Sequence, residues 1–175
     1  VTQRPSTNII EVAADEGAGA KGRGCYFWNK NSTLYICNDD TLYEHNYSDA
    51  SPITISSGVN RVYFAELSDY LVMLDPENNQ GWVISSSGAA QEMTGAGTVN
   101  GEALDVSGFP ADLSETLVDG LEVLDSTMYC FTEEARIRGS NLNNPLIWDA
   151  LNIITAENET DEGIFIAQHY DSLIA

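Results

Sequence analysis

Short runs of apolar and aromatic residues alternate with polar turns along most of this chain, which is typical of antiparallel β-strands. The first run, Cys25-Tyr26-Phe27-Trp28, is followed by a polar turn at 29–32, and a second turn at 38–40 separates the next two runs. An alternating segment at 53–56 adds a fourth run. The pattern predicts a first group of strands at 25–28, 33–37, 41–45 and 53–56.

The same arrangement returns further along the chain. The predicted strands of the later groups cover 62–66, 70–74 and 82–84, then 116–118, 121–124 and 128–131, and finally 164–167 with 173–174. A polar segment at 75–81 predicts the hairpin loop inside the second group. The best helical candidate is a short segment at 112–115 that follows Pro110. An all-β fold is therefore expected.

The length of the repeat can be measured between equivalent residues in the second strand of each group. Leu34, Leu71, Leu121 and Leu173 occupy it, with spacings of 37, 50 and 52 residues. A propeller blade has four antiparallel strands in about 40–50 residues, so the spacing predicts a portion of an antiparallel β-propeller. A β-sandwich, whose short strands recur as often, is the alternative. We expect residues 1–22 to form an extended arm and residues 23–175 to form a partial propeller that continues beyond this chain.

Charge restricts the partners that this chain can bind. Its 175 residues include 27 acidic and 7 basic side chains, which give a net charge of -20. Such a surface repels nucleic-acid phosphates and anionic membranes, because affinity for them depends on Lys and Arg. Two interpretations stay open: acidity that serves solubility or salty surroundings, and the wall of a lumen past which DNA slides without sticking. No run approaches the roughly 20 apolar residues of a membrane helix, so membrane insertion is not expected.

Catalytic and cofactor motifs are absent from the sequence. The two histidines, His45 and His169, do not stand at metal-ligand spacing with another His or Cys. No Gly-x-Ser-x-Gly elbow occurs, and the Gly-rich segment at 17–24 lacks the Lys-Ser/Thr of a phosphate-binding loop. We therefore expect no enzyme and no cofactor, although a triad assembled in space is not visible in a sequence.

Two further features, the cysteines and the oxygen-rich segments, have structural interpretations. Cys25, Cys37 and Cys130 are too widely spaced for a metal or redox motif, and buried free thiols are expected at Cys25 and Cys37. The oxygen-rich segments at 75–81 and 157–162 are candidates for Ca²⁺, but neither matches an EF-hand loop. We interpret both as polar hairpin tips and predict no metal site.

One basic segment and one tryptophan are candidates for subunit contacts. Arg136 and Arg138 form the densest basic spot of this acidic chain, so we expect them to pair with carboxylates of a neighbouring subunit. Trp148 follows Pro145 in a predicted loop, and we expect it to anchor this connection to the next blade.

Several segments of the chain stand in a distinctive order. Gly22-Arg23-Gly24 precedes the first strands, the segment 61–67 is followed by 70–75, and Asn141-Leu142-Asn143-Asn144-Pro145 is followed by Trp148-Asp149-Ala150-Leu151-Asn152. This order resembles the phage packaged-DNA stabilisation proteins, which are tail-hub or plug proteins of short-tailed phages, and the related propeller nozzle proteins. The resemblance extends from about Gln3 to Ala175. It departs from the family at Ser6, where a Gly is usual, and in its acidity.

The resemblance implies a structural virion protein of the phage tail or head–tail connector, located in the tail or neck. Its subunits would form a homo-oligomeric ring of six-fold symmetry below the portal, in contact with other tail, portal or adaptor proteins. The ring would retain packaged DNA and line or gate its exit channel, and double-stranded DNA would pass without sequence-specific binding. The family has no catalytic residues to carry over.

Two other functions remain open at this stage. A carbohydrate- or protein-binding propeller module on a virion or cell surface is the main alternative, and glycan binding would favour it. A hydrolase on a propeller scaffold is the third, and activity abolished by one acidic substitution would favour that one.

Overall fold

Antiparallel sheets make up the fold of this chain, as a computed structural model that describes residues 21–45, 50–155, 163–170 and 172–175 shows. Three sheets have four strands each, paired in chain order. Their strands are β1 (Gly22–Trp28), β2 (Thr33–Asn38), β3 (Thr41–His45) and β4 (Ala50–Thr54); β5 (Tyr63–Leu67), β6 (Tyr70–Asp75), β7 (Gln80–Ser85) and β8 (Ala90–Glu92); and β11 (Glu122–Leu124), β12 (Thr127–Phe131), β13 (Arg136–Gly139) and β14 (Ile153–Thr155). The prediction of an all-β fold is confirmed.

Two hairpins and one helical turn complete the described elements. The hairpins are β9 (Ala96–Val99) with β10 (Glu102–Asp105), and β15 (Ala167–His169) with β16 (Ser172–Ile174). The turn is the 3-10 helix η1 (Pro110–Leu113), which ends where Ser114 adopts a left-handed conformation with φ 57°. Within the described residues, no helix is long and apolar enough to cross a membrane.

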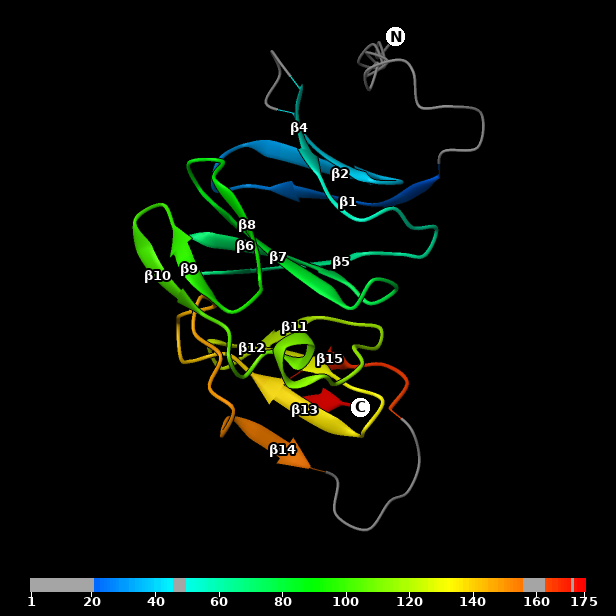
Figure 1. Cartoon of the computed structure of the whole chain (residues 1–175), viewed down its shortest axis with the longest axis vertical. Coiled ribbons are helices and arrows are strands. Elements are labelled where there is room, and N and C mark those ends of the chain that lie inside the picture. Colours follow the sequence, from blue (N-terminus) through cyan, green and yellow to red (C-terminus); the bar gives the residue numbers. More distant parts are fainter. Residues whose placement is uncertain (1–20, 46–49, 156–162, 171) are drawn as a thin grey trace, which may run out of the picture.

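Figure 1 shows the three four-stranded sheets lying one over another, with β1–β4 at one end of the stack. Strand β6 lies in the middle sheet and is buried at each of its 6 residues. Successive side chains of a strand point to opposite faces. Accordingly, Leu71 and Met73 pack towards the first sheet, whereas Val72 and Leu74 pack towards the third. This burial on both faces explains why the sequence of β6 is continuously apolar rather than alternating.

The interface between the second and third sheets contains more than strands. Val99 and Leu104 of the β9–β10 hairpin join this core, together with Phe109, Leu146 and Trp148 from loops. A third, smaller core lies on the far face of the β11–β14 sheet. There Phe131 and Ile137 pack against Ile166 and Leu173 of the C-terminal segment. The β15–β16 hairpin therefore covers part of that face.

Several predicted elements need correction. The segment 116–118 is not a strand, because only Leu117 forms an isolated bridge, to Thr132. The helical candidate at 112–115 is replaced by η1, since Pro110 starts the turn two residues earlier. Strands β8, β9, β10, β13 and β14 were not predicted, because all are short. All but β14 also contain Gly or charged residues that hide the apolar alternation.

The repeat itself is less even than predicted. Leu121 precedes β11, which is the first strand of its sheet, whereas the second strand is β12. The second strands therefore begin at Thr33, Tyr70, Thr127 and Ser172. The longest interval, from Tyr70 to Thr127, contains the β9–β10 hairpin and η1. An insertion between the second and third sheets is thus the reason for the uneven spacing.

Strand β1 begins at Gly22, next to the predicted boundary of the extended arm. Residues 1–20 of that arm lie outside the described residues, so the division of the chain at residue 22 stays a prediction.

Gly120 shows why the junction before the third sheet needs glycine. Its φ is +105°, and a Cβ at this position would lie 2.2 Å from the carbonyl oxygen of Ile166. The absence of a side chain lets the start of the third sheet approach the segment that leads into β15.

Candidate functional site

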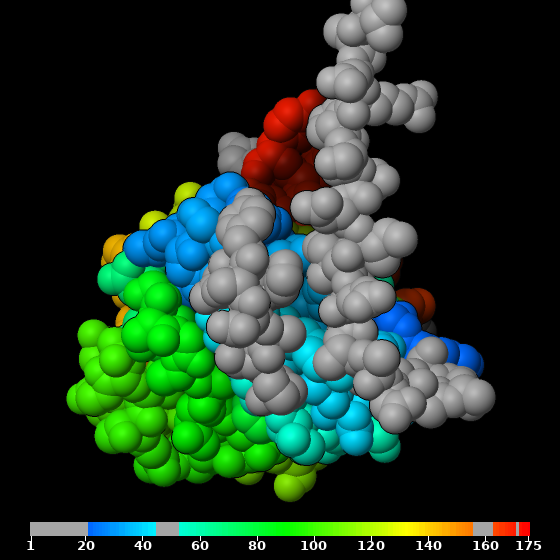
Figure 2. Space-filling model, turned by 90° about the horizontal axis from the view of Figure 1, so that it is seen from above, coloured from blue at the N-terminus to red at the C-terminus, as the bar shows by residue number. Residues whose placement is uncertain are grey.

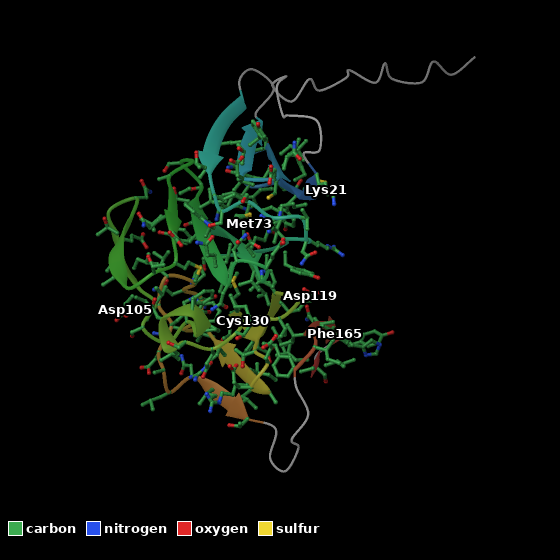
Figure 3. The ribbon with its side chains drawn as sticks, turned by 45° about the vertical axis from the view of Figure 1, so that its right-hand side comes forward. Lys21, Met73, Asp105, Asp119, Cys130 and Phe165 are labelled. Atoms are coloured by element: carbon green, nitrogen blue, oxygen red, sulfur yellow. The ribbon has the colours of Figure 1, made fainter. Side chains whose placement is uncertain are left out.

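A cleft of about 380 Å³ lies where the first strands of successive sheets come together. β1 contacts β5, β5 contacts β11, and β11 contacts β15. The cleft is lined by residues 24–26 of β1, residues 61–66 around β5, residues 121–123 at β11 and Gln168 of β15. A neighbouring hollow of about 470 Å³ shares Arg61, Tyr63 and Glu122 with it and extends to Asp119 and Phe165. Figure 3 shows Asp119 and Phe165 together on this side of the stack, opposite Asp105.

Aromatic rings and mixed charges form the surface of the cleft. Tyr26 of β1 and Phe64 of β5 stack with ring centroids 5.9 Å apart. The Arg61 guanidinium lies 5.2 Å from the centroid of the Tyr63 ring, within range of a cation–π contact. Burial and a hydrogen bond to Asp119 raise the pKa of Tyr63. Its phenol therefore keeps its proton, which it donates to Asp119, and the aromatic faces and the Arg61 guanidinium are the groups that the cleft presents.

The predicted subunit-contact arginines converge on one carboxylate of their own chain. Glu115 accepts from Arg138 Nε at 2.9 Å and from Arg138 Nη2 at 2.5 Å, and Arg136 Nη1 donates to it at 2.5 Å. The side chains of Glu115 and Arg138 are only 5% and 7% exposed, whereas that of Arg136 is 41% exposed. The expected pairing with carboxylates of another subunit stays a prediction, and Arg136 is the arginine of the two with exposed surface to make it.

The electrostatics of this cluster follow from its hydrogen bonds. Burial alone would raise the pKa of Glu115, but the hydrogen bonds from Arg138 and Arg136 outweigh burial and lower it. Charge-assisted, two-pronged contacts of this kind fix geometry as well as charge. Arg138 also donates to the carbonyl of Ala150 at 2.8 Å, which ties β13 to the loop before β14.

Trp148, the third predicted contact residue, lies in the core. Its side chain is fully buried, its Nε1–H donates to the carbonyl of Pro145 at 3.0 Å, and its ring meets Phe109 edge-on at 5.2 Å. The backbone of Trp148 donates to the carbonyl of Asp105 at 2.8 Å. Trp148 thus anchors its loop to the β9–β10 hairpin. A contact of this residue with another subunit stays a prediction.

A second buried arginine was not predicted. Arg23 Nη2 donates to Asp75 Oδ1 at 2.5 Å, and the other guanidinium nitrogens donate to the carbonyls of Asn60, Asp39 and Ser56. Because Arg23 belongs to β1 and Asp75 ends β6, the pair joins the first and second sheets. One signal of it was present in the sequence: each charge stands in or at the end of an otherwise apolar strand.

The hairpin between β6 and β7 connects the two arginine clusters. Besides Asp75, it contains Glu77, which accepts from the backbone N–H of Val59 and of Asn60 at 2.7 Å each. Asn79 donates to the carbonyl of Glu115 at 3.0 Å and accepts from the N–H of Leu117 at 2.8 Å. This hairpin was a candidate for Ca²⁺, but these side-chain oxygens bind donors of the protein itself. The other candidate, 157–162, lies outside the described residues.

The remaining candidates are possible metal ligands, the two histidines and the three cysteines. Across the part of the chain that the structure describes, no three His, Cys, Asp or Glu side chains come together as metal ligands would. His169 is exposed and lies against Tyr170. Cys37 and Cys130 are buried free thiols, but Cys25 is exposed, so the predicted burial of Cys25 is wrong. The side chain of His45 is not among those described.

Comparisons with known proteins give weak likenesses. No family model matches the chain, and no curated protein matches it. Among solved structures, Hsv2 of Kluyveromyces lactis is 10% identical with a TM-score of 0.40, over 78% of this chain and 38% of that one. A second Hsv2 structure, with a complete loop 6CD, gives a TM-score of 0.39, and one with a Gly-Ser linker in its place gives 0.38.

This chain therefore spans well under half of the length of the Hsv2 chains that it matches. A likeness this low carries no argument about the closure of the fold or about function. None of these matches points to a phage protein, so the resemblance to phage tail proteins stays a prediction.

Proposed function

We propose that this chain is a β-propeller portion of a structural protein in a phage tail or head–tail connector. The observation that carries the proposal is the succession of three four-stranded meanders, each stacked on the next, whose first strands border a common cleft. Propeller blades are four-stranded antiparallel sheets around a central channel. In this proposal, the cleft is a sector of that channel, and further strands and blades complete the ring of sheets.

The hydrogen bonds within the segment 141–152, which carries the resemblance, support a structural role for this chain. Asn144 Oδ1 accepts from the N–H of Leu146, and Asp149 Oδ1 accepts from the N–H of Leu151. Asn152 donates to Asn141 Oδ1 at 2.9 Å, so the polar side chains of this segment fix its own turns. The residues that carry the resemblance to the phage proteins therefore act as architecture, as expected for a family without catalytic residues.

The distribution of charge supports a position next to DNA that moves through a channel. Among the described acidic residues, only Asp75 and Glu115 are buried, and the others lie wholly or partly at the surface. A surface on which carboxylates far outnumber exposed cations such as Lys21, Lys30 and Arg61 offers few counterion-releasing contacts to a phosphate backbone. We therefore propose that DNA passes a ring of these subunits without being held to its wall. The isolated chain should show no measurable affinity for double-stranded DNA near physiological salt.

A carbohydrate- or protein-binding module is the second candidate. The stacked Tyr26–Phe64 pair and the Arg61–Tyr63 contact in the cleft favour it, because aromatic faces beside polar groups suit sugar rings and peptide side chains. Binding on a glycan array that Tyr26→Ala and Phe64→Ala abolish would support this candidate over the tail protein.

Cryo-EM of the particle from which this chain comes tests the proposal directly. The proposal requires density for the stacked sheets in a ring on the tail axis, with carboxylates toward the lumen. A position on the periphery, or a source without any such particle, would overturn it and favour the binding module.

A further inference from the structure

The two-residue turn between β9 and β10 has the sequence Asn100-Gly101, the one Asn-Gly pair in the sequence. Val99 pairs with Glu102 across it, and both turn residues have left-handed backbones, with φ 51° at Asn100 and φ 83° at Gly101. Asn-Gly is the preferred sequence of such a type I′ turn. Both residues are exposed, and Figure 2 shows the green part of the chain, which includes this hairpin, at the surface of the molecule. Water therefore reaches the tip of the hairpin.

The side-chain amide of Asn100 is free, unlike those of many other asparagines. Among the residues that the structure describes, it has no hydrogen-bond partner. Side-chain hydrogen bonds hold six others in place, namely Asn31, Asn78, Asn79, Asn141, Asn144 and Asn152. Apart from its chain neighbours, no heavy atom lies within 4 Å of the position that a Cβ of Gly101 would take. Neither the amide nor the glycine next to it is shielded by other parts of the fold.

We infer that Asn100 is a site of spontaneous deamidation through a cyclic imide. The backbone nitrogen of Gly101 attacks the side-chain carbonyl carbon Cγ of Asn100, and the new C–N bond closes a five-membered ring. Ammonia leaves and takes the proton of the attacking nitrogen. Water then opens the ring at either of its carbonyl carbons, which leaves an aspartate or an isoaspartate. Water is the only co-reactant, and the nitrogen of Gly101 is the least hindered one because glycine has no Cβ.

The folded turn delays this reaction. A left-handed residue has a ψ of about +47°, and at that angle the Gly101 nitrogen and the Cβ of Asn100 lie on opposite sides of the Cα–C bond. Ring closure needs the two atoms on the same side, so the turn must open first. Local opening of an exposed turn costs less free energy than global unfolding. The rate of deamidation therefore follows the opening of the β9–β10 hairpin.

A second pair that can form the same imide is protected by its surroundings. Asp119-Gly120 is the one Asp-Gly pair in the sequence. The Asp119 carboxylate accepts a hydrogen bond from Tyr63, and the Asp119 carbonyl accepts from the N–H of Ile166 at 2.9 Å. The close approach of Gly120 to the Ile166 carbonyl leaves this junction no room to rotate. The place of Asn100 in the fold, and not its dipeptide sequence alone, makes it the reactive site.

The isoaspartate product would disturb the hairpin, whereas the aspartate product would not. Isoaspartate adds one carbon atom to the main chain of a turn whose length sets the register of the two strands. Val99 and Leu104 are each 2% exposed in the core between the second and third sheets, so a shift of register would move one of them out of it. Asp-Gly suits a type I′ turn as well as Asn-Gly does. This inference goes beyond the proposed function and does not depend on it.

Incubation of the 175-residue chain at mildly alkaline pH, followed by digestion with endoproteinase Glu-C, tests the inference. Cleavage after Glu92 and Glu102 releases the peptide 93–102, in which Asn100 is the one asparagine. We expect this peptide to show the mass change from amide to acid before any other asparagine peptide does, with uptake of oxygen from isotopically heavy water. The reaction should be about tenfold slower in the native chain than in guanidinium chloride, which corresponds to an opening free energy of about 1.4 kcal/mol.

Two variants at the same position complete the test. Asn100→Gly keeps a sequence that suits the turn and removes the amide, so its 93–102 peptide should show no mass change. Asn100→Asp has the charge of the product on an ordinary backbone and should unfold like the parent, whereas the isoaspartate form should unfold at lower denaturant. Earlier modification of another asparagine in the native chain, or equal rates in native and denatured chains, would overturn the inference. So would an unmodified 93–102 peptide at the time when the expected native rate gives half-conversion.

Discussion

Glu115 and Arg138 meet through two hydrogen bonds of 2.5 and 2.9 Å, with both side chains almost completely buried. Glu115 stands in the loop before the third sheet, and Arg138 lies in its third strand. The backbone carbonyl of Glu115 also accepts from Asn79 of the second sheet. This pair therefore holds a strand, a loop and a neighbouring sheet together at one point.

Removing the Glu115 carboxylate should lower the free energy of unfolding. Glu115→Ala leaves Arg138 buried without its counter-charge, for which a loss of about 3–5 kcal/mol in the free energy of unfolding is typical. Urea unfolding followed by tryptophan fluorescence measures the change. Glu133→Ala, at an exposed glutamate nearby, is the control and should alter stability by no more than about 0.5 kcal/mol. Equal stability of the two variants would show that the buried pair contributes nothing.

The same group predicts a pH dependence. The folded-state pKa of Glu115 lies below its unfolded value, so its stabilisation is complete above the unfolded pKa of about 4.3 and is lost as pH falls through the folded value. The difference in unfolding free energy between the parent and Glu115→Gln should therefore be largest near pH 6–7 and should shrink below about pH 4. A difference that stays constant down to pH 3 would contradict the assignment.

Arg23 and Asp75 should be strongly coupled. Asp75→Leu leaves the Arg23 guanidinium buried with its carbonyl partners and the more distant Glu77 carboxylate, 3.6 Å from Nη2. Arg23→Met leaves Asp75 buried with Asn78 as its remaining side-chain donor. Each single change should destabilise by about 3–5 kcal/mol, and the double variant by less than the sum. Additive losses in a double-mutant cycle would mean that the two side chains act independently.

Thiol titration should distinguish the three cysteines. Burial raises the pKa of Cys37 to about 11 and also raises that of Cys130, whereas Cys25 is exposed. Because the thiolate is the reactive form, the native protein should show one fast-reacting thiol, and Cys25→Ser should show none. In denaturant, the parent should show all three. Rapid reaction of a second thiol in native conditions would indicate that a sheet interface opens readily.

The sequence predicted strands best where a strand is buried on both faces. The continuous apolar run 70–74 predicted a strand, and it is the strand buried on both faces. Polar turns predicted the hairpins around it. The short strand β13, with the sequence RIRG, does not look like a strand, because both of its arginines pair with Glu115 and interrupt the apolar alternation. Local pattern carries no information about that distant partner.

The sequence marks the predicted contact arginines as unusual, but it does not identify the partners that they have in the folded chain. Arg136 and Arg138 stand out in an acidic chain, yet Glu115 is one of 27 acidic residues, and nothing nearby in sequence marks it as the partner. The same holds for Arg23 and Asp75, which are 52 residues apart. Pairings of this kind depend on how sheets stack, which is a property of the tertiary fold alone.

The order of the stack also has a consequence for synthesis. Each sheet is completed by strands that are neighbours along the chain, and each packs on the sheet made just before it. A growing polypeptide can therefore finish and dock one sheet before the next leaves the ribosome, since domains generally fold from the N-terminus during translation. The apolar face that awaits the next sheet then belongs to the newest sheet alone, which limits the apolar surface through which nascent chains could associate.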